Sequence, residues 1–119
     1  MQTITLYRPV GRAELDLIEA SGWREFPPRL AVQPIFYPVL QLEYARQIAR
    51  EWNTKDPSSG YAGFVTVFNV NADFLKRYSV HNVGSIWHQE YWIPAGDLTE
   101  FNRAIVGTIR VVEAHSTDA

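Results

Sequence analysis

The sequence predicts an α+β domain built on a mainly antiparallel sheet. Strand-type runs occur along the whole chain, whereas the two longer segments with helical apolar spacing both lie in its first half. A chain of 119 residues suits one hydrophobic core, and the sequence contains no internal repeat or linker. We therefore expect a single domain over residues 1–119, with a frayed tail at 114–119.

The first unit is expected to be a strand followed by a helix. Residues 3–8 alternate between two faces, and the Pro9-Val10-Gly11 sequence is expected to break the strand. Residues 12–20 place apolar side chains at helical spacing and end at Ser21-Gly22. The proline-rich segment 23–34 is expected to be an ordered loop.

The second unit repeats this order. Residues 35–39 are a short apolar run of strand type, and Pro38 marks its edge or its end. Residues 41–53 then predict the clearest amphipathic helix, whose apolar positions are Leu42, Ala45, Ile48, Ala49 and Trp52. A turn is expected at 56–60.

The second half of the chain is dominated by strand-type runs. Strands are predicted at 61–70, 78–83, 85–94 and 105–113. Short helical pieces are expected at 72–77 and after the turn at 94–97, reaching Asn102. Together these elements complete the mainly antiparallel sheet.

The aromatic run at 85–94 holds one carboxylate, Glu90, in its middle. In an extended strand Ile86, His88, Glu90 and Trp92 share one face, because side chains alternate. A carboxylate between bulky neighbours is exposed at an edge, paired with a cation, or placed in a cleft for a ligand, since burying it unpaired is costly. The last possibility makes Glu90 the first functional candidate.

Composition excludes several classes of site. The chain has no cysteine, which excludes disulfides, thiolate metal sites and a cysteine nucleophile. It also lacks a phosphate-binding glycine loop, a zinc pattern and a nucleophile elbow. A metal site made of His81, His88 and Glu90 is disfavoured by its spacing, and we predict no metal; His88 is then expected to be a partly exposed hydrogen-bond donor.

The sequence gives no sign of a membrane or nucleic-acid partner. It has no signal-peptide pattern and no apolar run of membrane-spanning length, so a cytoplasmic protein is expected. The formal net charge of −2 gives no bulk attraction to polyanions. Its arginines at 24, 29, 46 and 50 are too scattered for a nucleic-acid-binding stripe.

Three short motifs, in order along the chain, carry a family resemblance. They are Leu6-Tyr7-Arg8, the Ile35-Phe36-Tyr37 run with the following Glu43-Tyr44-Ala45, and Gln89-Glu90-Tyr91-Trp92-Ile93. These resemble the signature segments of ADP-ribosyltransferases, and the last looks most like the diphtheria-toxin and poly-ADP-ribose-polymerase branch. The chain as a whole is similar to short bacterial proteins labelled "ADP-ribosylation/crystallin J1".

This resemblance implies a split sheet around a cleft that binds NAD as substrate. It implies that Glu90 is the catalytic acid and that Arg8, Phe36, Tyr37, Tyr44 and His88 are candidate NAD-binding residues. Arg8 would contact NAD, Phe36 or Tyr37 would wall the nicotinamide pocket, and Tyr44 would stack on the ring. The acceptor of ADP-ribose would be a protein, a nucleic acid, a small molecule or water; arginine is disfavoured because His88 stands where arginine-modifying toxins carry Gln or Glu.

The same residues also have purely structural interpretations. Arg8 would form an ion pair with Glu90 or Glu14, Tyr37 and Tyr44 would be core aromatics, and Glu90 would protect an edge strand. A module that keeps the fold but only binds a nucleotide-like ligand or a protein is the alternative function. In that case Trp87, Tyr91 and Trp92 would form a recognition surface.

Overall fold

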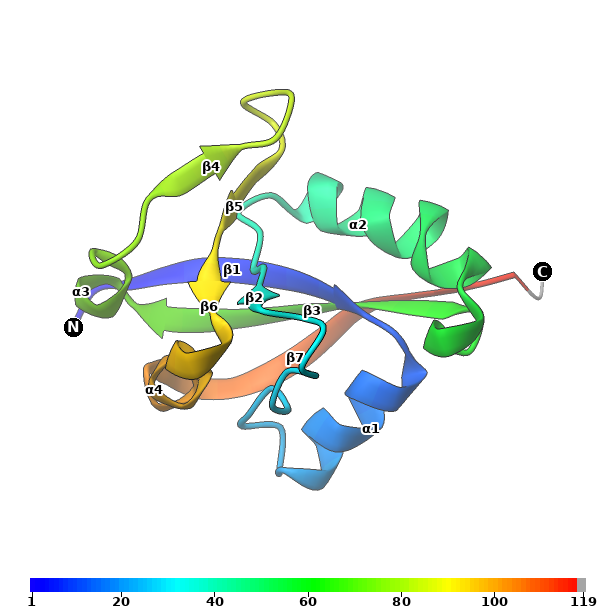
Figure 1. Cartoon of the computed structure of the whole chain (residues 1–119), viewed down its shortest axis with the longest axis horizontal. Coiled ribbons are helices and arrows are strands. Elements are labelled where there is room, and N and C mark those ends of the chain that lie inside the picture. Colours follow the sequence, from blue (N-terminus) through cyan, green and yellow to red (C-terminus); the bar gives the residue numbers. More distant parts are fainter. Residues whose placement is uncertain (118–119) are drawn as a thin grey trace.

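A central antiparallel sheet of three strands forms the body of the protein (Figure 1). In the computed structural model, which describes residues 1–117, the strand order is β1-β3-β7. The strands are β1 Thr3–Val10, β3 Ala62–Asn71 and β7 Ile105–Ser116. β3 lies in the middle and is buried along nearly its whole length, which explains why its sequence is continuously apolar rather than alternating.

Two helices cover opposite faces of this sheet. They are α1 Arg12–Ala20 and α2 Leu42–Glu51. Ile18 of α1 belongs to the main core together with Phe68 of β3, whereas Ala45 and Ala49 of α2 form a smaller core with Val65 of β3. Side chains of β3 alternate between the two cores, as the pleat of a strand requires.

Short helical elements complete the chain. The α-helices are α3 Ala72–Leu75 and α4 Leu98–Arg103, and the 3-10 helices are η1 Asn53–Lys55, η2 Pro57–Ser59 and η3 Ala95–Asp97. No helix within residues 1–117 has both the length and the apolar character needed to span a membrane.

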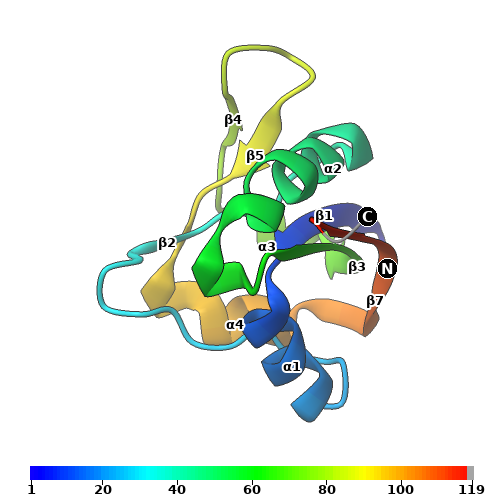
Figure 2. The same ribbon diagram turned by 90° about the vertical axis from the view of Figure 1, so that its right-hand side faces the viewer.

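Two small antiparallel pairs lie beside the central sheet. β2 Ile35–Phe36 pairs with β6 Ile93–Pro94, and β4 Val80–Asn82 pairs with β5 Gln89–Tyr91. The β4–β5 hairpin extends away from the three-stranded sheet (Figures 1 and 2). The prediction of an α+β fold with antiparallel sheets is confirmed.

The segment around Val39 connects β1 to β5. Val39 exchanges two backbone hydrogen bonds with Tyr7 of β1, at 2.8 and 2.9 Å. On the other side Pro38 and Leu40 each form a backbone bond with β5, at 3.0 Å. Three separate segments of the chain therefore run side by side, and this arrangement positions the candidate site.

The prediction of one strand over 85–94 is wrong. Residues 85–88 form the turn of the β4–β5 hairpin, and Trp92 separates β5 from β6. Gly84 at φ +81° and the Ser85 hydroxyl, which accepts a hydrogen bond from the Trp87 N–H at 3.0 Å, build this turn. Ile86 is therefore exposed in a loop and shares no strand face with Glu90.

The predicted break at Pro9 is also wrong, because β1 continues to Val10. The N–H of Tyr7 points away from β3 toward Val39, and backbone donors two residues apart in a strand point the same way. A backbone N–H at position 9 would therefore point away from β3. Proline, which lacks this N–H, fits here without the loss of a hydrogen bond between β1 and β3.

The prediction of a frayed tail at 114–119 is wrong for residues 114–116. Residues 114–116 belong to β7, where they pair with residues 62–64 of β3. The sequence of this segment has no apolar alternation. Its strand conformation depends on pairing with β3. Residues 118–119 of the predicted tail lie outside the described residues.

Candidate active site

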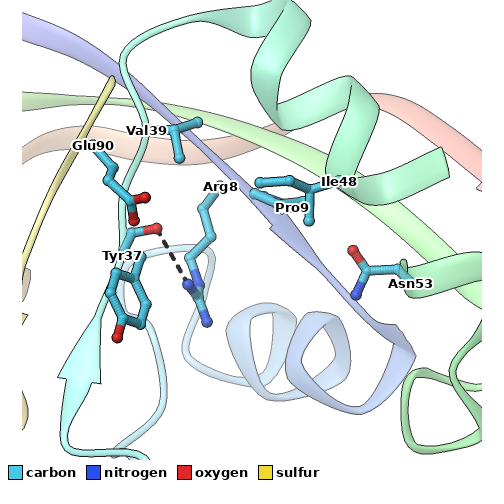
Figure 3. A pocket seen from close by; sticks show the side chains of 7 residues that line it. All are labelled: Arg8, Pro9, Tyr37, Val39, Ile48, Asn53 and Glu90. Carbon is cyan, nitrogen blue, oxygen red and sulfur yellow. Dashed lines mark hydrogen bonds between the residues drawn. The ribbon is translucent and has the colours of Figure 1, made fainter. Parts of the chain in front are cut away.

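A cavity of about 340 Å³ opens where β1, the Val39 segment, α2 and β5 meet (Figure 3). Its lining residues are Arg8, Pro9, Tyr37, Val39, Ile48, Asn53 and Glu90. The cavity thus combines one cation, one carboxylate and an aromatic ring with aliphatic walls. Three of the predicted site residues, Arg8, Tyr37 and Glu90, lie together in it.

Glu90 is held in the cavity by the backbone. It lies in β5 and forms a bridge with Val39, which in turn pairs with Tyr7, the neighbour of Arg8. Glu90 is only 7% exposed. Its carboxylate points into the cavity toward Arg8 and Tyr37 (Figure 3).

The surroundings of Glu90 favour its protonated form. Burial raises the pKa of the Glu90 carboxyl above its ordinary value. Hydrogen bonding from Tyr44 and Trp92 and the nearby His81 act in the opposite direction without cancelling the effect of burial. A carboxyl with a raised pKa beside a cavity is typical of catalytic sites.

Tyr44 contacts Glu90 but is not among the residues that line the cavity. Its hydroxyl donates a hydrogen bond to Oε1 of Glu90 at 3.1 Å. Burial and the charge of Glu90 raise the pKa of Tyr44 to about 12, so the hydroxyl remains a donor at neutral pH. One face of the Tyr44 ring is stacked on His88, with centroids 4.6 Å apart. Tyr44 and His88 therefore contact each other, where the sequence predicted contacts with NAD.

Phe36, the last residue of β2, and Tyr37, which follows it, have different surroundings. Phe36 is fully buried in the main core and does not line the cavity, so of the two residues considered for the pocket wall it is Tyr37 that can serve. Tyr37 is 41% exposed and lines the cavity. The burial of Phe36 fixes the orientation of Tyr37.

Trp92 forms an aromatic rim with two of its neighbours. Its ring is stacked on His81, with centroids 3.7 Å apart and planes at 4°. It also meets Tyr37 edge to face, at 6.4 Å. From the sequence, His81 was a candidate only as a metal ligand. The pairing of β4 with β5, which places His81 opposite Glu90, has no local sequence signal.

Arg8 is fixed by an ion pair with Glu14 of α1. Its Nε and Nη2 atoms donate to the two carboxylate oxygens of Glu14, at 2.7 and 3.0 Å. The guanidinium also lies 4.5 Å from the centre of the Phe36 ring, and Nη1 donates to the carbonyl of Tyr37 at 3.5 Å. Of the two partners considered from the sequence, Glu14 is therefore the one that binds Arg8. Glu14 was not among the predicted site residues, although its place in the first turn of the helix after β1 was a usable signal.

A second, more polar cavity lies beside the first. This neighbouring cavity measures about 460 Å³ and shares Arg8, Pro9 and Asn53 with the first. Arg29 and Ser58 are among the residues that line it. We call these two adjacent cavities the groove; Glu90 lines the first cavity, Arg29 lines the second, and Arg8 lines both.

Within residues 1–117, no group of three or more His, Asp or Glu side chains is placed to hold a metal ion. Comparisons with protein-family models, with curated proteins and with solved structures each gave no match. Function is therefore inferred from the chemistry and geometry of the groove.

Proposed function

We propose that this protein cleaves NAD and transfers its ADP-ribose group to an acceptor, or to water. The proposal depends on one observation: Arg8, Tyr37 and Glu90 line the same cavity. They come from three chain segments that lie side by side. These are the residues that the resemblance to ADP-ribosyltransferases assigns to substrate binding and catalysis. The mostly antiparallel, divided sheet is compatible with that family.

Glu90 carries the chemistry in this proposal. The bond between the ribose C1′ atom and the nicotinamide nitrogen breaks, and its electron pair leaves with nicotinamide. The ribose becomes positively charged, and a fixed carboxylate that accepts a hydrogen bond from a ribose hydroxyl stabilises that charge. The acceptor's nucleophilic atom then forms a bond to C1′ and gives up its proton. The reaction requires the ionised form of Glu90.

The aromatic rim suits the leaving group. The nicotinamide ring of NAD is flat and cationic, and such rings bind well against aromatic faces. Tyr37 and Trp92 are both partly exposed beside Glu90, at 41% and 44%. The aliphatic walls formed by Val39 and Ile48 limit the access of water to the carboxylate.

A second candidate is a binding module without catalysis. The tip of the β4–β5 hairpin exposes Ile86 and Trp87, at 64% and 70%, which favours contact with a protein partner. In such a module the groove would bind a nucleotide-like ligand but not cleave it. The two candidates differ in a single observable, the release of nicotinamide.

Two measurements on one preparation separate these candidates. Titration of NAD against tryptophan fluorescence reports binding near Trp92, and chromatography of the same mixture reports nicotinamide. Saturable quenching with nicotinamide release supports the transferase or hydrolase. Saturable quenching without release, with and without cell extract as a source of acceptors, supports the module. Absence of both rejects NAD as the ligand.

A further inference from the structure

The polar half of the groove contains an arginine that the proposed chemistry does not use. Arg29 lies in the loop between α1 and β2 and lines the 460 Å³ cavity next to the Glu90 cavity. Gln33 and Ser58 line the same cavity and are neutral hydrogen-bonding groups. Arg8 and two acids, Glu14 and Asp56, line this cavity as well.

Arg29 forms no ion pair among the described residues. Its Nε atom is buried without a hydrogen-bond partner within residues 1–117, and the side chain forms no ion pair there. The nearby carboxylate of Glu14 has both oxygens bound to Arg8. A buried guanidinium donor without a hydrogen-bond partner destabilises the protein. A ligand that accepts this hydrogen bond would remove that free-energy cost.

The other acid of this cavity is also occupied. Asp56 accepts hydrogen bonds from the backbone N–H and hydroxyl of Ser58 and from the hydroxyl of Ser59, at 2.7 to 3.1 Å. It caps the 3-10 helix η2 and forms no ion pair with Arg29. The formal charges of the cavity lining therefore balance, two arginines against two acids, but both acids already accept hydrogen bonds from other groups, and within residues 1–117 the Nε donor of Arg29 has no acceptor.

Arg8 and Arg29 are held on the same aromatic ring. Their guanidinium carbons lie 4.5 and 5.9 Å from the centre of the Phe36 ring. Burial and, after it, the charge of Arg8 lower the pKa of Arg29, while the charge of Glu14 acts in the opposite direction. Two neighbouring guanidinium groups, of which only Arg8 is paired with a carboxylate, are suited to a bound anion with several oxygen acceptors.

We propose that Arg29, together with Arg8, binds a phosphate group of the substrate. The inference rests on the proposed function, in which the pyrophosphate of NAD crosses Arg8 while its nicotinamide end lies beside Glu90. Arg29 then acts as a specificity-determining residue that selects substrates with phosphate over nucleosides without it. It does not contact the bond that breaks.

The test is a calorimetric titration of the wild-type protein and of Arg29→Gln with ADP-ribose, pyrophosphate, inorganic phosphate and adenosine. We expect Arg29→Gln to weaken the binding of ADP-ribose and of pyrophosphate by about ten- to a hundredfold, because charge-assisted hydrogen bonds are lost. Adenosine binding should not change. Arg24→Gln, which removes an exposed arginine from the same loop, is the matched control and should change none of these affinities by more than about twofold.

Equal affinities of Arg29→Gln and Arg24→Gln for ADP-ribose would overturn the inference. If Arg29→Gln does not fold, the wild-type protein decides alone: ADP-ribose must bind at least about tenfold more tightly than adenosine, and equal binding overturns the assignment. Binding of pyrophosphate without any release of nicotinamide from NAD would leave the anion site standing and reject the proposed function. Release of nicotinamide with the same KM in Arg29→Gln and wild type would support the proposed function and reject the role of Arg29 in phosphate binding.

Discussion

The hydroxyl of Tyr44 donates a hydrogen bond to the carboxylate of Glu90 at 3.1 Å, from a helix on one face of the sheet to β5. This bond is a direct link between α2 and the candidate catalytic group. Because it stabilises the charged form, it opposes the effect of burial on the pKa of Glu90.

Tyr44→Phe should therefore raise the pKa of Glu90 further. The acidic limb of the pH profile of nicotinamide release should move to higher pH, while the rate on the plateau changes less. The same shift should appear in the carboxyl resonance of Glu90 in an NMR titration, which requires no activity. Tyr61→Phe is the control, since Tyr61 is half exposed and its hydroxyl has no bond to Glu90. An unchanged titration of Glu90 in Tyr44→Phe would contradict this role.

Glu90→Gln should make the folded protein more stable above the pKa of Glu90. The folded pKa is raised, so between the unfolded and folded pKa values only the folded state holds the proton, and the free energy of unfolding falls as pH rises through that window. Glutamine keeps an acceptor for Tyr44 and carries no charge. We expect a gain of about 0.5–2 kcal/mol in thermal or urea unfolding at pH 8, and little difference below the unfolded pKa. A loss of stability at pH 8 would show that the charged form is not disfavoured.

Glu14→Gln should release Arg8 from its fixed orientation. The variant loses a charge-assisted pair at a half-buried site, which should cost about 1–3 kcal/mol of folding stability. Ligand affinity should fall because Arg8 is no longer preorganised, whereas the pH dependence set by Glu90 should stay the same. Glu19→Gln, an exposed acid on the same helix, is the control. A shift of the pH profile in Glu14→Gln would assign Glu14 a role in proton transfer that the geometry does not predict.

Gly63→Ala should loosen the contact between α2 and β3. A Cβ atom at Gly63 would lie 2.5 Å from the carbonyl oxygen of Ala49 and 2.8 Å from the Cβ of Asn53, so the helix has to move. We expect a loss of about 1–3 kcal/mol on chemical unfolding, together with weaker ligand binding because α2 carries Tyr44 and Ile48. At Gly96 an added Cβ meets nothing within 4 Å, and Gly96→Ala should be close to neutral. Similar stability of the two variants would argue against this packing.

Much of the fold follows from local sequence patterns. The helices at 12–20 and 42–51 were predictable from apolar spacing, and the buried strand β3 from its continuous apolar run. The turn at 85–88 was not, because Ile86 and Trp87 favour a strand by composition while Gly84 and the Ser85 hydroxyl bend the chain. The order of β7 beyond residue 113 depends on its partner strand and has no signal of its own.

The site was predictable only where strand alternation and motif order apply. Arg8, Tyr37 and Glu90 share a cavity, whereas Phe36 is buried in the core. Glu14 and Arg29 were not among the predicted site residues, because their importance comes from contacts across the fold with Arg8 and Phe36. Pairing of this kind has no fixed spacing along a chain.

The most direct test of the proposed function is the rate of nicotinamide release from NAD by the wild-type protein and by Glu90→Gln at pH 8, with cell extract as a source of acceptors. We expect release by the wild-type protein and its loss, by at least about a hundredfold, in a Glu90→Gln variant that is shown to be folded by its unfolding transition. Equal rates in the two proteins, or no release by the wild-type protein with or without extract, would contradict the assignment of Glu90 as the catalytic acid of an NAD-cleaving enzyme.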